Sequence, residues 1–151
     1  IEAEPLFQRD LAISERVFGS NHPDVGIGLN NLAKLYCIQD RATEAEPLFQ
    51  RALAILEPAL GPDHPHLAVG FHNLAGLYRD QGRTTEAESL YQRALIIWEY
   101  TLDPDHPYVA LSLENYAVLL EQTGRAAEAA PLRARAQAIR ERHAQANPST
   151  S

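Results

Sequence analysis

Cysteine and methionine are almost absent from this chain, and each absence excludes something. Cys37 is the only cysteine, so no disulfide can form within the chain, and we expect a reducing compartment, the cytoplasm. There is no methionine, and the sequence opens inside a recurring pattern with IEAEPLFQRD. We therefore expect a C-terminal piece of a larger protein.

Basic charge and long apolar runs are also lacking. The net charge is −7, whereas nucleic-acid binding usually rests on a basic face, so we expect no nucleic-acid partner. No apolar run approaches the roughly 18 residues that are needed to span a bilayer, and no signal-peptide pattern opens the chain. We expect no membrane association.

The residue patterns of common catalytic sites are missing as well. There is no glycine-rich phosphate loop, because Gly61, Gly82 and Gly124 stand singly between predicted helices. Cys37 has no evident histidine partner that would activate it as a nucleophile. We expect a protein that is not an enzyme and that needs no cofactor.

Histidine is abundant by contrast, and the stretch DHPHLAVGFHN raises the question of a metal site. His66 and His72 are six residues apart, so on a helix they are separated by roughly 9 Å and point in different directions. Zinc needs each nitrogen at about 2 Å, so we predict no metal site. The histidines that precede proline mark helix starts, for which the expected N-caps are Asn21, Asp63 and Asp105.

The most specific signal in the sequence is an internal repeat with a period of 42 residues. EAEPLFQR at Glu2 recurs as EAEPLFQR at Glu44, EAESLYQR at Glu86 and EAAPLRAR at Glu128. Apolar residues within each unit follow the i, i+3, i+4, i+7 spacing of a helical face, so each unit is predicted to form two helices. The spacing of a capping box at the start of the second helix is shown by Thr43 with Glu46 and by Thr85 with Glu88.

These units resemble the tetratricopeptide repeat. One unit matches that family's signature spacing with Leu74, Ala75, Tyr78, Ala87, Tyr91 and Ala94, and the preceding unit with Leu32, Ala33, Tyr36, Ala45, Phe49 and Ala52. The 42-residue period with DHP connectors is similar in particular to the repeats of kinesin light chains and of related bacterial scaffolds. The last unit departs from the pattern, because Leu120 replaces the tyrosine and Arg133 replaces the aromatic residue of the second helix.

The resemblance implies an all-α, right-handed superhelical solenoid of antiparallel helix pairs, with about seven helices. We expect one domain over residues 1–146, made of a half repeat at 1–20 and full repeats at 21–62, 63–104 and 105–146. Residues 147–151 are expected to form a disordered tail.

The two ends of this array differ. The final helix has a polar outer side, as a terminal capping helix requires, formed by Arg133, Arg135, Arg140 and Arg142. The first helix instead carries an apolar face that lacks a partner helix: Leu6, Phe7, Leu11, Ile13, Val17 and Phe18. We hypothesise a homo-oligomer through this helix, and the alternative function is an oligomerisation or spacer module for an upstream effector domain.

The resemblance also implies that the first helices of the units line a concave groove, which binds an extended peptide or a partner segment. Asn31, Asn73 and Asn115 recur at one position of these helices. An amide can donate to and accept from a peptide backbone whatever the side chains of the peptide are. The same amides can instead hydrogen-bond between helices of the scaffold, and the sequence leaves both interpretations open.

Positions beside these asparagines vary between units, as positions that set specificity would. Three such positions are compared across the three full units. The first holds Asn30, His72 and Glu114, the second Lys34, Gly76 and Val118, and the third Cys37, Arg79 and Glu121. Because the first two units are basic here and the third is acidic, we hypothesise a bipolar groove that favours acidic ligand residues near Lys34 and Arg79. His72 is expected to contact the ligand and to respond to pH.

Overall fold

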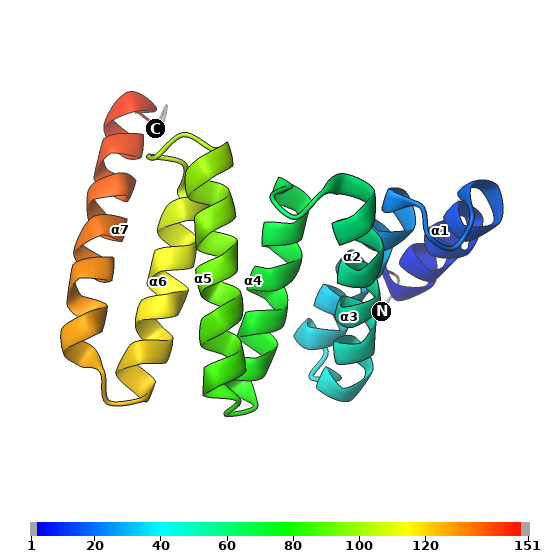
Figure 1. The fold of residues 1–151 in the computed structure, drawn as a ribbon, viewed down its shortest axis with the longest axis horizontal. Coiled ribbons are helices and arrows are strands. Elements are labelled where there is room, and N and C mark those ends of the chain that lie inside the picture. The colour runs from blue at the N-terminus through cyan, green and yellow to red at the C-terminus, as the bar shows by residue number, and fades with distance from the viewer. Residues whose placement is uncertain (1–2, 149–151) are drawn as a thin grey trace.

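The computed structural model describes residues 3–148, which form seven α-helices and no strand. The helices are α1 (Ala3–Phe18), α2 (Pro23–Ile38), α3 (Ala42–Leu60), α4 (Pro65–Asp80), α5 (Thr84–Thr101), α6 (Pro107–Gln122) and α7 (Ala126–Ala146). Figure 1 shows them side by side in chain order. The predicted all-α fold with seven helices is confirmed, while most of the predicted tail at 147–151 lies outside the described residues.

Consecutive helices run antiparallel and pack most closely in pairs, α2 with α3, α4 with α5 and α6 with α7. Each pair then stacks on the next through α3 against α4 and α5 against α6. The first helices of the pairs also touch one another, α2 with α4 and α4 with α6. They therefore form one continuous surface, on which residues from different repeats meet.

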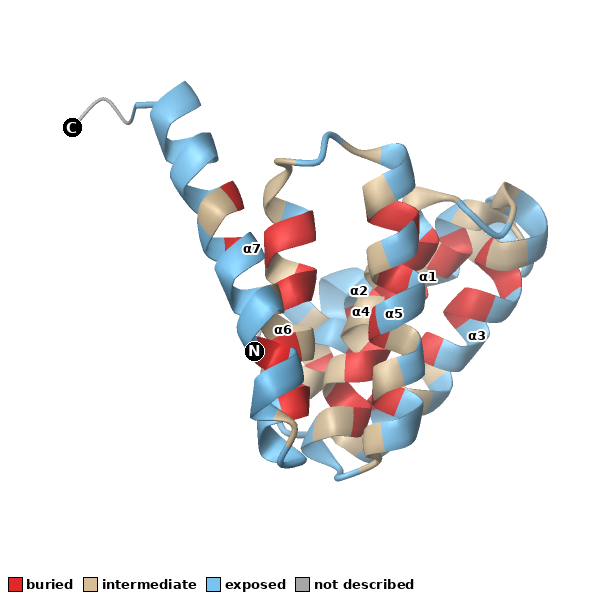
Figure 2. Cartoon of the chain, turned by 60° about the vertical axis from the view of Figure 1, so that its left-hand side comes forward, coloured by how far each residue is buried: buried red, intermediate tan, exposed pale blue. Residues whose placement is uncertain are grey.

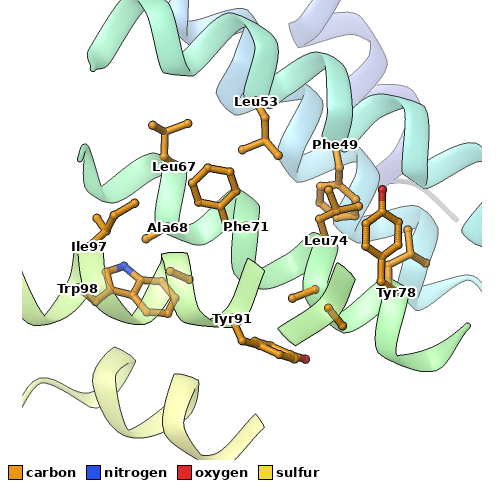
Figure 3. Close-up of a cluster of buried hydrophobic side chains, with 14 of the residues drawn as sticks. Phe49, Leu53, Leu67, Ala68, Phe71, Leu74, Tyr78, Tyr91, Ile97 and Trp98 are labelled. Carbon is orange, nitrogen blue, oxygen red and sulfur yellow. The ribbon is translucent and has the colours of Figure 1, made fainter. Parts of the chain in front are cut away.

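Small residues let the paired helices approach closely, and aromatic side chains fill the space between them. The alanines at the signature positions are fully buried: Ala33, Ala45, Ala75 and Ala87. Phe49, Tyr91 and Trp98 are buried in the same core (Figure 3). The burial follows the inner faces of the stacked helices, whereas most of α7 is exposed (Figure 2).

The first helices are capped by histidine, one residue later than the sequence predicts. The Nδ1 atoms of His22, His64 and His106 accept the backbone N–H two residues further on, at 3.2, 3.2 and 3.1 Å. The prediction of Asn21, Asp63 and Asp105 as N-caps was wrong because proline follows each histidine. Proline takes the first helical position and keeps the residue before it out of the helical conformation, so that residue becomes the cap.

The second helices begin without the predicted capping box. Their N-cap residues, Arg41, Arg83 and Arg125, make no side-chain cap hydrogen bond. Thr43 and Thr85 already lie inside the first turn, so Glu46 and Glu88 are too far along the helix to reach back to its start. These two glutamates accept hydrogen bonds from Arg83 and Arg125 of the following repeat instead.

Arginine–glutamate pairs recur across the repeat boundaries with the period of the sequence. In one row, Arg41, Arg83 and Arg125 reach Glu4, Glu46 and Glu88 of the preceding repeat, at 2.8 Å in each case. In a second row, Arg51, Arg93 and Arg135 reach Glu15, Glu57 and Glu99. Each pair is partly exposed and contributes little alone, but the rows fix the same register at every boundary.

The tyrosine that the last unit lacks is replaced from a neighbouring position. In the other repeats, the hydroxyl groups of Tyr36 and Tyr78 accept hydrogen bonds from glutamines of the preceding second helix. Leu120 cannot do this, but the hydroxyl of Tyr116 accepts from Gln92 at 2.8 Å and donates to Glu88 at 2.9 Å. The polar contact between these repeats is therefore kept, although the residue that makes it has moved by one helical turn.

The C-terminal end of the stack is closed by ion pairs between α6 and α7. Arg133 binds Glu121, and Arg140 binds Glu114, both through two nitrogens. Arg142 pairs with Asp105 in the same region. Arg133 and Arg140, which were expected on the outer side of the final helix, therefore bind α6, and Arg135 binds Glu99 of α5.

The N-terminal end is apolar and open. No described residue of α1 is buried, and Leu6 and Val17 are 60% and 64% exposed. Leu11 differs from the expectation, because it is half-buried and packs against the core beside α2. Among the helices described, none combines the length and the hydrophobicity that crossing a membrane requires.

Candidate ligand-binding cleft

A cleft of about 380 Å³ opens on the surface formed by the first helices. Half of its lining residues come from α4, and single residues of α2, α3, α5 and α6 and of the turns after α2 and α4 complete it. Four of the predicted groove residues meet here: His72, Asn73, Arg79 and Asn115. The stacking of α4 on α2 and α6 therefore brings together side chains that lie 43 residues apart in the sequence, as His72 and Asn115 do.

His72 is bound to the scaffold from two sides. Its Nε2 lies 3.1 Å from Nδ2 of Asn115, so the amide donates to the ring when Nε2 is unprotonated. The ring also packs against Tyr91 and Trp98, with centroid distances of 5.5 and 5.4 Å. These contacts hold His72 as one wall of the cleft.

The same environment keeps His72 neutral at physiological pH. Burial, followed by the positive charges of Arg79 and Lys34, lowers the pKa of His72 from 6.5 to about 4. The expected pH response therefore lies well below the neutral range. A sequence cannot show this shift, because Lys34 belongs to another repeat and the burial depends on α5.

The three asparagines do not share a single cleft. Asn73 and Asn115 line the cleft described above, whereas Asn31 lines a separate one of about 300 Å³ between α1 and α2. Asn115 already binds His72, which is the scaffold role that the sequence left open. Asn73 is thus the asparagine of the set best placed to meet a ligand in the larger cleft.

The remaining predicted groove residues have other surroundings. Asn30 is only 7% exposed and faces the neighbourhood of Gly70 on α4, so it lies between helices and not in the groove. Lys34 is exposed at the surface of α2. Glu114 and Glu121 are paired with arginines of α7, so the acidic half of the proposed bipolar groove is neutralised by α7.

The cleft offers little for covalent or metal chemistry. Cys37 lines it, but burial, with a further contribution from Asp80, raises the pKa of the thiol and disfavours the reactive thiolate. Within residues 3–148, no group of three or more His, Cys, Asp or Glu side chains is arranged to hold a metal ion. His64 and His66 stack on each other, and His64 uses Nδ1 as a cap.

One cleft residue, Tyr91, was not predicted to be functional. It lines the cleft beside Gly76, whose position the sequence had marked as variable between units. A signal was present, because Tyr91 occupies the position of Phe49 in the preceding unit and so adds a hydroxyl group to an otherwise apolar site. Only the structure shows that this hydroxyl reaches the cleft.

Comparisons with known proteins agree with this architecture. One sequence model of the tetratricopeptide repeat matches residues 26–95 and 66–142, and a second matches residues 1–24. A search of curated proteins found no match.

Solved structures show the same fold. The crystal structure of BtubC (BKLC) from P. vanneervenii superposes with a TM-score of 0.83 at 23% identity, over 93% of this chain and 56% of that one. The putative kinesin light chain of Podosopora anserina, described as having nearly identical TPR-like repeats, gives 0.80 at 28% identity, over 93% and 67% of the two chains.

The predicted right-handed solenoid with repeats of the kinesin-light-chain-like type is thereby confirmed. The chain spans little more than half the length of BtubC. With its repeats matched over most of their length, the chain belongs to the tetratricopeptide repeat family.

Proposed function

We propose that this chain is a scaffold that holds an extended peptide or a segment of a partner protein against the surface of α2, α4 and α6. Tetratricopeptide repeats generally mediate protein–protein interaction and are typically not enzymes. The observation that supports the proposal is the cleft of about 380 Å³, which presents the amide of Asn73 and the guanidinium of Arg79. These groups suit the donors and acceptors of a peptide.

Selection of a random peptide display library against this chain tests the proposal. Peptides that bind the parent should bind Asn73→Ala on the order of tenfold more weakly, because a hydrogen bond in the cleft is lost. Asn31→Ala is the matched control, since Asn31 lines the separate cleft beside α1. Failure to select any peptide would overturn the proposal, and a loss confined to Asn31→Ala would move the binding site to α1 and α2.

The basic residues of the surface favour an acidic ligand. Arg79 lines the cleft, and Lys34 lies close enough to lower the pKa of His72. Arg79→Glu should therefore weaken the binding of an acidic peptide more than that of a neutral one, with a difference that shrinks as salt is added. If Arg79→Glu weakened the binding of the acidic and the neutral peptide equally, charge would not determine the specificity of the cleft.

A second candidate function is self-association, in which the array serves as an oligomerisation or spacer module. It is favoured by the apolar face of α1, where Leu6, Ile13, Val17 and Phe18 are all at least half exposed. Sedimentation at micromolar concentration should detect an oligomer in the parent and a monomer in the Ile13→Glu, Val17→Glu double variant. A parent that stays monomeric would eliminate this function.

A further inference from the structure

Tyr91 is buried except at its hydroxyl group, which opens on the cleft and has no hydrogen-bond partner in the described part of the chain. The residue is 1% exposed, and its ring is held between His72 and Tyr116, at centroid distances of 5.5 and 6.5 Å. The hydroxyls of Tyr36, Tyr78 and Tyr116 each bind a glutamine, whereas that of Tyr91 makes no hydrogen bond within residues 3–148. Figure 3 shows it directed away from Phe71 and Trp98. A hydroxyl that opens on a cleft and has no protein partner is free to bond to a ligand.

Gly76 leaves the path to this hydroxyl open. It lies inside α4, where glycine disfavours the helix, and the corresponding residues of the other repeats are Lys34 and Val118. A Cβ atom at position 76 would lie 3.7 Å from the Tyr91 hydroxyl. Any larger side chain there would extend over the floor of the cleft, so glycine at this position gives access at the expense of helix stability.

The cleft around the hydroxyl holds hydrogen-bond donors and charges of both signs, from Arg79, Asp40 and Asp80. Asn73 and Arg79 line the same cleft. Arg79 uses Nε and Nη2 on the carboxylate of Asp80, both at 3.1 Å, which leaves Nη1 without a polar contact in the described part of the chain. In agreement with this arrangement, burial raises the pKa of Tyr91, and Arg79 opposes that rise more than Asp80 adds to it.

We propose that Tyr91, Asn73 and Arg79 form a subsite for a single carboxylate side chain, Asp or Glu, of the bound peptide, and that Gly76 admits it. A carboxylate accepts hydrogen bonds from a hydroxyl, an amide and a guanidinium at once. Asp40 and Asp80 also line the cleft, so the subsite takes one acidic residue and repels an acidic run. This inference rests on the proposed peptide-binding function and assigns its specificity to one repeat.

Two substitutions isolate the subsite. Tyr91→Phe removes only the hydroxyl and installs the residue that Phe49 already supplies in the preceding repeat. Gly76→Val installs the residue that Val118 supplies in the following one and covers the floor. Tyr78→Phe is the matched control, because its hydroxyl binds Gln50 outside the cleft. Circular dichroism and melting show which of these variants keep the fold.

Two probes separate this proposal from the broader one. By nuclear magnetic resonance, N-acetyl-aspartyl methylamide should shift the backbone signals of Asn73 and Gly76, and its leucyl and asparaginyl counterparts should do so less. Its affinity should fall about tenfold in Tyr91→Phe and in Gly76→Val and stay unchanged in Tyr78→Phe. Peptides selected from the display library should carry one acidic residue whose contribution disappears in the same two variants.

The subsite is overturned if the aspartyl compound binds no better than the leucyl one, or if Tyr91→Phe leaves either probe unaffected. Library peptides that bind but ignore Tyr91 and Gly76 would contradict the subsite and keep the peptide-binding function. Aspartyl binding that depends on Tyr91, in the absence of any selected peptide, would support the subsite and contradict the function.

Discussion

Four of the six histidines have one of two roles, which are set by the ring nitrogen that each one uses. His22, His64 and His106 accept a backbone N–H through Nδ1 at the start of a helix. His72 instead meets Asn115 through Nε2 in the wall of the cleft. The same residue type thus serves local structure in the connectors and packing between repeats in the groove.

The cap at His64 can be tested by substitution. His64→Ala removes the acceptor for the His66 N–H and should lower the free energy of unfolding by about 1 kcal/mol. His64→Asp restores a good cap acceptor and should return most of that stability, as measured by urea denaturation. Equal losses in both variants would show that the ring contributes through its stacking on His66 and not as a cap.

His72 should make stability depend on pH between about 4 and 6.5. Because burial and the charges of Arg79 and Lys34 lower its pKa to about 4 in the folded chain, the unfolded chain binds the proton first as pH falls. The contribution of neutral His72 is therefore complete above pH 6.5 and is lost as pH falls to about 4. The loss should amount to about 3 kcal/mol.

Urea denaturation across this pH range measures the effect. In His72→Gln the free energy of unfolding should change much less over the same interval, and the exposed His66→Gln should behave as the parent does. The paired carboxylates of Glu114 and Glu121, whose pKa values are lowered by Arg140 and Arg133, lose their contribution at lower pH. A parent whose stability is flat from pH 6.5 to about 4 would contradict the burial of neutral His72.

Two glycines within the first helices have different surroundings, Gly26 in α2 and Gly76 in α4. In α2, a Cβ atom on Gly26 would lie 2.7 and 2.9 Å from Cγ and Cδ2 of Leu56 in α3. In α4, a Cβ atom on Gly76 would meet only the Tyr91 hydroxyl, at an ordinary contact distance. One glycine is required by packing, and the other keeps the cleft open.

Alanine substitutions at these two positions should therefore change stability in opposite directions. Gly26→Ala should destabilise by about 1–3 kcal/mol, because α2 and α3 must move apart. Gly76→Ala should stabilise α4 by up to about 1 kcal/mol, because alanine favours the helix. Thermal denaturation of both variants decides the matter, and a loss of stability in Gly76→Ala would indicate a packing role.

At the scale of the whole molecule, the stack is stable in its middle and weak at its beginning. Residues of α4 and α5 lie in the central core cluster, whereas α1 contributes no buried residue and touches only α2 extensively. In a repeat array each unit is stabilised mainly by its neighbours. A helix with a neighbour on one side should therefore open more often.

Hydrogen exchange should show this gradient directly. Amides of α1 should exchange faster than those of α4 and α5 by a factor of about ten or more, because α1 opens locally without the rest unfolding. Mass spectrometry of the exchanging chain resolves the helices. Equal protection in α1 and α4 would mean that α1 is covered in solution and would favour the self-association proposed above.

Much of this fold follows from the repeat itself. The 42-residue period places the alanines and aromatics of each unit on the same faces, so the number, order and pairing of the helices were predictable. The predicted cap residues were wrong by one position, because Pro23, Pro65 and Pro107 hold the preceding histidine in an extended conformation and so make it the cap. The exchange of Tyr116 for the missing tyrosine depends on contacts between repeats, which spacing alone does not reveal.

The sequence predicted which surface carries the candidate site, but not the contacts that each side chain makes there. The recurrence of Asn31, Asn73 and Asn115 indicated the first-helix surface, but each position has different neighbours. Asn31 faces α1, Asn115 binds His72, and Asn73 lies between them in the larger cleft. Glu114 meets Arg140 of α7, which stands at the position where the preceding repeat carries Trp98. Position in the array, and not only position in the repeat, decides what each side chain does.

The recurrence of the arginine–glutamate pairs makes the unit 63–104 an exchangeable cassette. Arg83 and Arg93 meet the preceding repeat, and Glu88 and Glu99 meet the following one, in the same pattern at both boundaries. A second copy inserted in tandem would find the same partners at each new junction. Because Gly76 and Tyr91 belong to this cassette, each inserted copy would repeat the proposed carboxylate subsite. A peptide that carries several acidic residues at matching intervals would then bind through avidity.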